Sequence, residues 1–171
     1  ENLDATAPRA MAVLRPLRLI IQNYPEGGEE FFHLPNHPKD PDIGSRKVGF
    51  SREIFIEADD FTETPPPKYF RLSPGREVRL RGAYLVTCTD VIKGPDGKIE
   101  AVLCTYDRAT RGGDAPDGRK VKGTLHWVSA AHAVPAEVRL YERLFNAEFP
   151  GRDGDFLSQI NPESLETLTG C

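Results

Sequence analysis

Cysteine is scarce in this sequence of 171 residues, and the three that occur have no regular spacing. An odd number of cysteines without a CxxC pair does not fit the disulfide framework of a small secreted protein. The four histidines also lack zinc spacing to one another or to a cysteine, so no metal site is predicted. The residues concerned are Cys88, Cys104, Cys171, His33, His37, His126 and His132.

Long apolar runs are absent as well, which excludes a membrane-spanning helix. The first residues, ENLDATAPRA, have neither a starting Met nor the apolar core of a signal peptide. We therefore expect a piece of a longer cytoplasmic chain that does not contact a membrane.

An excess of positive charge is missing too, because 22 Lys and Arg stand against 26 Asp and Glu and the formal net charge is −4. A protein that coats nucleic acid without sequence preference would be basic, and no DNA partner is expected. A local basic site remains compatible with this charge. The 39% of hydrophobic residues suffices for one compact domain or two small ones.

The motifs of common enzymes are absent from the chain. There is no GxxxxGK[ST] phosphate loop, no GxGxxG, and no GxSxG elbow around Ser129 and His132. An acidic group lacks the spacing of a calcium loop, and we interpret it as a solvated edge. No catalytic residue is predicted in this chain. The acidic group comprises Glu57, Asp59, Asp60 and Glu63.

The chain does contain many turn residues, 15 Gly and 15 Pro, between short apolar stretches. The clearest hairpin joins residues 76–94 to 98–107 through the turn at 95–97. Three consecutive prolines at 65–67 exclude a central strand there. We predict a mainly antiparallel β fold of barrel or sandwich type. Further strands are predicted at 18–24, at 29–35 as its hairpin partner, at 52–61, at 120–129, and at 136–145 as a strand or strand-to-helix transition.

Two cysteines face each other in the clearest hairpin if its turn is centred on Asp96. Cys88 then lies opposite Cys104. Two half-buried thiols in a reducing cytosol are one interpretation, and a regulatory disulfide is the other.

Basic residues gather between 68 and 81. In REVRLRGAY (76–84), strand alternation would place Glu77, Arg79 and Arg81 on one face, where the two arginines repel each other unless an anion lies in front of them. Arginines and aromatics on a β-surface suit unpaired RNA bases. A solvated face paired with carboxylates is the alternative, and the residues alone leave both open. The group comprises Lys68, Tyr69, Phe70, Arg71, Arg76, Arg79 and Arg81, with Arg119, Lys120 and Lys122 following in GRKVKG.

Six segments carry a family resemblance: TAPRAMAVLRPLRLIIQNYPEG, PNHPKDPDIGSRKVGFSREIFIEADDF, REVRLRGAY, CTYD, DGRKVKGTLHWVSAAHAVPAEVRLYERLF and FLSQINPESL. Together they resemble the C-terminal anticodon-binding region of bacterial-type glutaminyl-tRNA synthetases. The resemblance covers essentially the whole chain. It implies a monomeric class I synthetase that joins glutamine to its tRNA, using ATP with Mg²⁺ in a catalytic domain upstream. This chain itself would bind the anticodon loop and no cofactor.

The resemblance also implies two antiparallel β-barrels. The proximal barrel would comprise about 1–23 and 120–171, and the distal barrel about 24–119. The proximal barrel would be incomplete, because a late strand with two more anticodon contacts should follow residue 171. Trp127 is expected to be buried between the barrels.

In this family the anticodon bases are splayed apart and bound singly, and matching positions suggest the contacts. Where family members can carry a lysine beside the third base, this sequence has Phe70, which we expect to stack instead. The implied tRNA contacts are Arg9 with the middle base, Arg71 with the third, Arg79 and Arg81 with the first, and Lys39 near the anticodon.

The sequence leaves two alternatives to this function. One is the equivalent region of an archaeal or eukaryotic-type glutamyl-tRNA synthetase, although HPKDPDIGSR and HWVSAAHAVP look closer to the glutamine enzymes. The other is a stand-alone β interaction module that binds protein or sugar and whose arginines are merely solvated.

Overall fold

The computed structural model describes residues 2–152 and 154–171, and within them it contains eleven strands and one short α-helix. This confirms the prediction of a mainly β fold. The chain divides into two compact units, Glu1–Ala133 and Val134–Cys171. Among the described residues, no helix has the length and hydropathy of a membrane-spanning segment.

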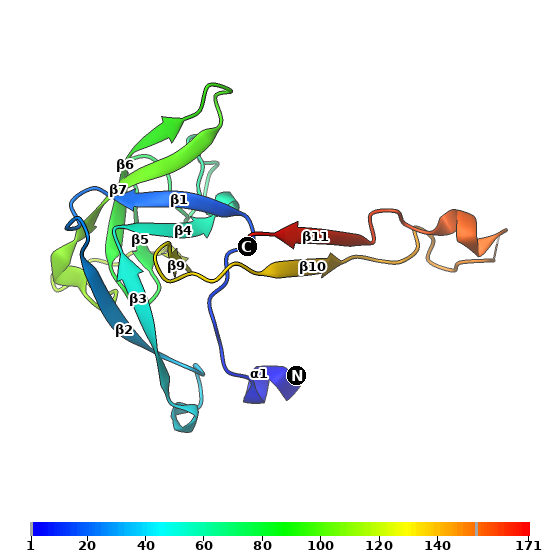
Figure 1. Ribbon diagram of the computed structural model, residues 1–171, viewed down its shortest axis with the longest axis horizontal. Helices are drawn as coiled ribbons and strands as arrows, with labels where there is room; N and C mark the ends of the chain where they lie inside the picture. Colours follow the sequence, from blue (N-terminus) through cyan, green and yellow to red (C-terminus); the bar gives the residue numbers. More distant parts are fainter. Residues whose placement is uncertain (1, 153) are drawn as a thin grey trace. The chain divides into compact units, whose positions relative to one another are not determined.

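Most strands of the first unit belong to one curled, seven-stranded sheet of barrel type (Figure 1). The elements of this unit are α1 (Asn2–Thr6), β1 (Pro16–Ile21), β2 (Glu29–Pro35), β3 (Ser45–Ser51), β4 (Glu53–Glu57), β5 (Glu77–Leu80), β6 (Leu85–Lys93), β7 (Ile99–Asp107), β8 (Thr124–Leu125) and β9 (Val128–Ser129). The strand order of the sheet is β8-β5-β6-β7-β1-β4-β9, while β2 and β3 form a separate antiparallel pair. The predicted boundaries of a proximal and a distal barrel stay a prediction.

The predicted hairpin between 18–24 and 29–35 is wrong, although both strands exist. Strand β1 is bonded antiparallel to β4 on one side and parallel to β7 on the other, so both of its edges are occupied. Strand β2 therefore pairs with β3 instead. The parallel neighbours of this sheet, β1 with β7 and β5 with β8, show that it is not purely antiparallel.

Other predicted strands are shorter than expected. The strand predicted at 52–61 ends at Glu57, where a 3-10 turn, Ala58–Asp60, begins. The strand predicted at 120–129 is divided into β8 and β9 by His126 and Trp127. As the prolines at 65–67 predicted, the chain there belongs to no strand.

The hairpin of β6 and β7 has the predicted register, with Cys88 opposite Cys104. Both cysteines are free thiols and fully buried, so they are more enclosed than the half-buried pair expected from sequence. A hydrogen bond between the two side chains, together with burial, raises the pKa of the Cys104 thiol. A regulatory disulfide at this pair stays a prediction.

The interior of the first unit is organised around the ring of Phe50. Four aromatic rings surround it at centroid distances of 5.0–5.7 Å, all edge-on. Such edge-to-face pairs are favourable beyond the area they bury. Trp127 is the nearest of the four and is completely buried, whereas its predicted place between two barrels stays a prediction. The other three rings are those of Tyr24, Phe32 and Tyr84.

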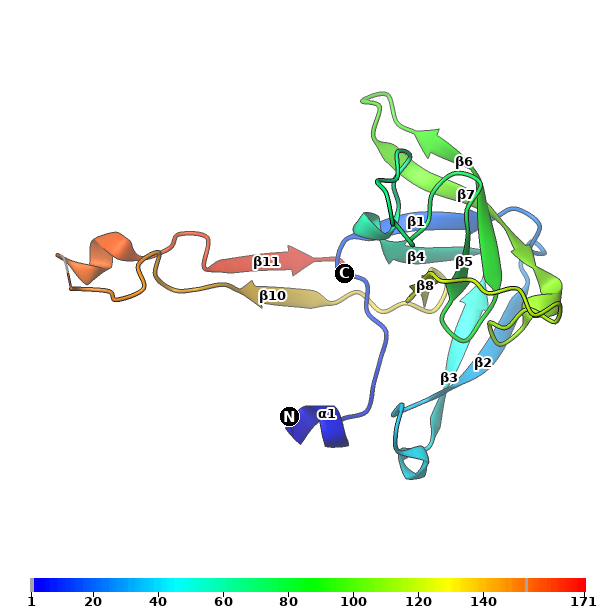
Figure 2. The same cartoon turned by 180° about the vertical axis from the view of Figure 1, so that it is seen from behind.

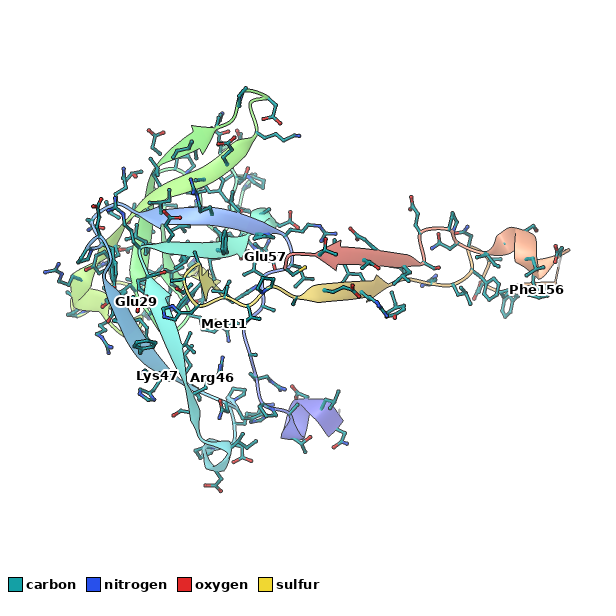
Figure 3. All side chains as sticks on the ribbon, viewed as in Figure 1. Met11, Glu29, Arg46, Lys47, Glu57 and Phe156 are labelled. Carbon is teal, nitrogen blue, oxygen red and sulfur yellow. The ribbon has the colours of Figure 1, made fainter. Side chains whose placement is uncertain are left out.

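The carboxylate of Glu57 ties the chain before β1 to the end of β4 (Figure 3). Its two oxygens accept the backbone N–H groups of Leu14 at 2.8 Å and Arg15 at 3.0 Å. His126 Nε2 lies 3.6 Å from Glu57 Oε1. The interpretation of the acidic group as a solvated edge is therefore wrong for Glu57, and also for Asp60, which is buried.

Replacing Glu57 with Gln should lower the free energy of unfolding at neutral pH by about 1–2 kcal/mol, since hydrogen bonds to a charged acceptor are lost. Burial tends to raise the pKa of this carboxyl, but the two backbone hydrogen bonds and His126 lower it overall. A lowered folded-state pKa stabilises the protein above the unfolded pKa, and this is lost as the pH falls through the folded value.

The acid limb of the stability curve, measured by urea unfolding between about pH 6 and pH 3, should thus be flatter in Glu57→Gln. The control is Glu53→Gln on the same strand, whose partly exposed side chain lies 3.7 Å from that of Arg18. Equal acid limbs in the two variants would contradict this role of Glu57.

The second unit is built on a two-stranded antiparallel ribbon of β10 (Glu137–Tyr141) and β11 (Leu165–Thr169). The strand predicted at 136–145 is thus confirmed for its first part. Between the strands, Asp155 caps the 3-10 helix Phe156–Gln159 by accepting from the Leu157 N–H. Phe156, the first residue of this helix, is labelled in Figure 3.

Candidate nucleic-acid interface

Strand β5 places its side chains on two faces, as the alternation predicts. Val78 and Leu80 are fully buried, whereas Glu77 and Arg79 are partly exposed. Arg81 lies beyond the last residue of the strand. The prediction of one continuous strand from 76 to 94 is therefore wrong at this point.

A tight turn separates β5 from β6. The Ala83 N–H donates to the Leu80 carbonyl at 2.9 Å. Gly82 has a φ of 67°, which favours glycine at the third position of the turn. Arg81 occupies the second position and is exposed.

The backbone of Arg81 is held on both sides although its side chain is free. Its N–H donates to the Leu125 carbonyl at 2.9 Å, and its carbonyl accepts the Trp127 indole N–H at 3.1 Å. The neighbouring strand β8 runs parallel to β5 and brings these two residues to the turn (Figure 2). In the part of the chain that the structure describes, the Arg81 guanidinium has no hydrogen bond or ion pair. A fixed backbone thus carries a cation that is available to an anion or a base edge.

Arg79, the other arginine of this pair, already has partners. Its Nε donates to the Gly113 carbonyl, and its Nη2 lies 3.4 Å from an oxygen of Asp114. Part of the Arg79 charge is therefore compensated within the chain. The sequence had indicated repulsion between Arg79 and Arg81 but not these partners. Because a guanidinium has five N–H donors, Arg79 keeps donors for a further contact.

Arg71 is anchored beside the 3-10 turn after β4. Its Nη1 donates to the Asp59 carbonyl at 3.1 Å, and its Nε lies 3.2 Å from Asp60 Oδ1. Burial raises the pKa of the Asp60 carboxyl, an effect that Arg71 partly opposes. Roughly half of the Arg71 side chain stays exposed, so the anchored guanidinium still faces solvent.

Phe70, the predicted stacking residue, is 46% exposed. Lys122 places its ammonium 5.0 Å from the centre of this ring. The sequence did not indicate this neighbour, since 52 positions separate the two residues.

Arg9 and Lys39 form a second group, around helix α1. Arg9 donates to the carbonyls of Leu3, Asp4 and Ala7, and Arg9 and Lys39 both pair with the Asp4 carboxylate, at 2.7 and 3.9 Å. A basic side chain that binds the last carbonyls of a helix is a common form of C-terminal cap. The structure therefore brings Arg9 and Lys39 together.

Arg119, counted from sequence among the gathered cations, is neutralised. Its guanidinium contacts carboxylate oxygens of Glu77 at 2.9 Å, Asp107 at 2.6 Å and Asp117 at 2.8 Å. These hydrogen bonds raise the pKa of Arg119, and they lower the pKa of Asp107. Arg119 thus fastens the loop after β7 to β5 rather than offering a charge to a ligand.

Replacing Gly123 with Ala should destabilise the first unit by about 1–3 kcal/mol, because a Cβ there would overlap the Phe70 carbonyl oxygen and neither backbone can easily move. The matched control is Gly94→Ala, where the nearest atom is the mobile end of the Glu100 side chain and the cost should be within about 0.5 kcal/mol. Guanidinium chloride unfolding of both variants checks this. Equal midpoints would show that the two backbones do not pack closely.

Comparisons with known proteins identify the family of this chain. A family model described as "tRNA synthetases class I (E and Q), anti-codon binding domain" matches residues 7–107, and a second model with the same description matches residues 124–171.

Curated relatives match over nearly the full chain. The "Glutamine--tRNA ligase" of Nitrobacter hamburgensis is 60% identical over 170 residues, which is 99% of this chain and 30% of that protein. The protein of the same name from Bradyrhizobium diazoefficiens is 57% identical over 100% of this chain and 30% of its own length. That from Clostridium kluyveri is 52% identical over 99% of this chain and 31% of its own length.

The chain spans about 30% of the length of these relatives. The first family model alone covers more than half of its residues, and the second covers most of the remainder. The chain belongs to the anticodon-binding domain family of the class I tRNA synthetases for glutamate and glutamine.

Proposed function

We propose that this chain recognises the anticodon loop of the glutamine tRNA as part of a glutaminyl-tRNA synthetase. The observation that carries this proposal is Arg81, an arginine with no partner among the described residues, on a turn whose backbone is bonded to Leu125 and Trp127. The relatives named above, all glutamine--tRNA ligases, support the choice of glutamine over glutamate.

Recognition would rest on a few fixed cations rather than on a general positive field. The chain has a net charge of −4, so RNA that does not fit these positions gains little from long-range attraction. A guanidinium can bond a base edge with two parallel N–H groups, which makes it selective for one base. Arg81 and Arg79 would read the first anticodon base, Arg71 the third, and Arg9 the middle one, with Lys39 close by.

The rest of the reaction would take place outside these residues. A catalytic domain, upstream in the same protein, would bind ATP with Mg²⁺ and glutamine, and the protein would act as a monomer in the cytoplasm. The described part of this chain has no group of three or more His, Cys, Asp or Glu side chains that could hold a metal ion. The contribution of this chain is to bind and orient the anticodon loop.

Equilibrium binding of short RNAs tests the proposal. Fluorescence anisotropy is measured with an anticodon stem-loop of the glutamine tRNA, with one of the glutamate tRNA and with one in which the three anticodon bases are scrambled. The glutamine stem-loop should bind most tightly. A preference for the glutamate stem-loop would favour the glutamyl enzyme, and equal binding of all three would contradict anticodon recognition.

A further inference from the structure

An unusual backbone conformation precedes Phe70. The Tyr69 N–H donates to the Pro66 carbonyl at 3.1 Å, which closes a turn through Pro67 and Lys68. Lys68 has a φ of 66°, the one positive value among the described residues that are not glycine. A non-glycine residue in this region costs free energy, and such strained residues cluster at functional sites. The turn delivers Phe70 to the surface with its ring 46% exposed.

A second segment is packed against the backbone of Phe70. Gly123 approaches the Phe70 carbonyl so closely that no Cβ would fit, and the Gly123 carbonyl accepts the Arg79 N–H at 2.8 Å. The contact with Phe70 and the bond to β5 fix the position of Lys122, the preceding residue. Its ammonium lies 5.0 Å from the centre of the Phe70 ring.

The charge of Lys122 is not neutralised by the part of the chain that the structure describes. Among residues 2–152 and 154–171, no carboxylate lies within ion-pair distance of its ammonium. Phe70 and Lys122 therefore combine an exposed ring, a free cation and a fixed backbone, three properties that suit a nucleotide, whose base stacks and whose phosphate is anionic.

A second lysine–aromatic pair of the first unit lacks these properties. Lys47 lies 3.8 Å from the ring centre of Phe31 on the β2–β3 hairpin (Figure 3). The same ring is packed edge-on against His132 at 5.4 Å, and the carboxylate of Glu29 lies 3.9 Å from His132. A nearby negative charge and a ring already in contact disfavour a nucleotide there.

We propose that Phe70 and Lys122 together bind one nucleotide of the RNA. In this binding step, Phe70 stacks on an unpaired base and Lys122 pairs with a phosphate of the same RNA strand. This step rests on the function proposed above and adds Lys122 to the interface. Parallel pairing of β8 with β5 sets Thr124 opposite Arg79, so Lys122 lies two residues before β8, towards the beginning of β5, whereas Arg81 follows the end of β5. Four extended residues separate two such levels by at most roughly 13 Å. One RNA strand of a few nucleotides can therefore contact both.

The chemistry of this step differs from that of Arg81. Every base has a π-face and every nucleotide a phosphate, so stacking and ion pairing strengthen binding without selecting a sequence. A phosphate contact releases counterions from the RNA. The logarithm of the association constant therefore falls as the logarithm of the salt concentration rises, with a slope of roughly −0.7 for each phosphate contact on a single strand.

The test measures the dissociation constants of the full chain for the glutamine anticodon stem-loop and for its scrambled counterpart at several salt concentrations. Lys122→Ala should weaken binding of both RNAs by the same factor and reduce the salt slope by roughly 0.7. Phe70→Leu should weaken binding of both RNAs by about fivefold or more. Its salt slope should not change, because the substitution removes stacking but no charge. The control, Lys98→Ala, removes an exposed lysine at the turn between β6 and β7 and should leave the slope unchanged.

A slope for Lys122→Ala equal to that of Lys98→Ala would overturn the phosphate contact, and wild-type affinity in Phe70→Leu would overturn the stacking. Lys122→Gln, which keeps most of the side chain, replaces Lys122→Ala if the latter unfolds, as judged by its circular dichroism. The measurement distinguishes a failure of the proposed anticodon recognition from a failure of the proposed Phe70–Lys122 contact. Wild-type chain that binds both RNAs equally contradicts anticodon recognition, whereas discrimination with an unchanged Lys122→Ala slope contradicts only this step.

Discussion

Replacing Arg81 with Ala is expected to remove about 1–3 kcal/mol of discrimination at one anticodon position, a factor of roughly 5 to 150 in relative affinity. The guanidinium is free within the described residues, and its backbone is bonded to Leu125 and Trp127, so little freedom is lost when it meets a base. Affinity for the native stem-loop should fall, while affinity for a stem-loop already substituted at the contacted base should change little. A double-mutant cycle of protein and RNA variants measures this coupling.

The matched control for Arg81 is Arg18→Ala. Arg18 is exposed on β1 and lies 3.7 Å from the carboxylate of Glu53, so its loss should leave discrimination unchanged. Arg81→Lys separates two kinds of contact, because lysine keeps the charge but lacks the two parallel donors. Full recovery by Lys, or an equal loss for every RNA, would mean that Arg81 binds a phosphate and does not read a base.

Replacing Trp127 with Ala should lower the free energy of unfolding by about 3–5 kcal/mol. The side chain is completely buried, its ring lies 5.0 Å from that of Phe50, and its indole N–H donates to the Arg81 carbonyl. The substitution leaves a large cavity next to the central aromatic cluster. Guanidinium chloride unfolding, followed by circular dichroism because the single tryptophan is lost, measures the effect.

Trp127→Phe distinguishes packing from the positioning of Arg81. Phenylalanine fills much of the same space but cannot donate to the Arg81 carbonyl, so stability should fall less than in the Ala variant. Discrimination at the Arg81 base should nevertheless decline, because the turn loses one of its two anchors. Phe50→Leu disturbs the same cluster without touching that hydrogen bond and serves as the control. If both variants lower discrimination equally, Trp127 has only a packing role.

Local patterns in the sequence predicted several of the strands, although β3 and β11 were not among them. The turn at 95–97 and the alternation of β6 and β7 were enough to place Cys88 opposite Cys104. Strand β2 occupies its predicted range, 29–35. A strand's existence depends on its own residues, whereas its neighbours depend on which edges the rest of the sheet leaves open. The parallel pairing of β1 with β7 and of β5 with β8 therefore had no local signal.

The candidate site was predicted in its residue types but not in their partners. Arginines at 79 and 81 looked equivalent, yet the turn around Gly82 places Arg81 outside the strand, and the loop after β7 supplies partners to Arg79 alone. Gly82 was the available signal, since a glycine after a short alternating run often marks a turn. Ion pairs such as Arg119 with Glu77 join distant positions and cannot be read from one sequence.

The family resemblance supplied a function that the residues alone did not establish. It identified the anticodon-binding family, which the family models show, whereas composition alone left an RNA surface and a solvated face equally open. It could not reveal Lys122 over Phe70, because that contact depends on how the segment around Gly123 packs against the chain after the three prolines.

The central claim, that the anticodon loop binds at β5 and the segments beside it, is tested most directly by photo-crosslinking. Each anticodon position of the glutamine stem-loop carries 4-thiouridine in turn, and mass spectrometry identifies the peptides attached after irradiation. We predict cross-links within residues 69–84 and 120–127, with the middle base also reaching the peptide that contains Arg9. Cross-links confined to other parts of the chain, such as β10 and β11, would contradict the account.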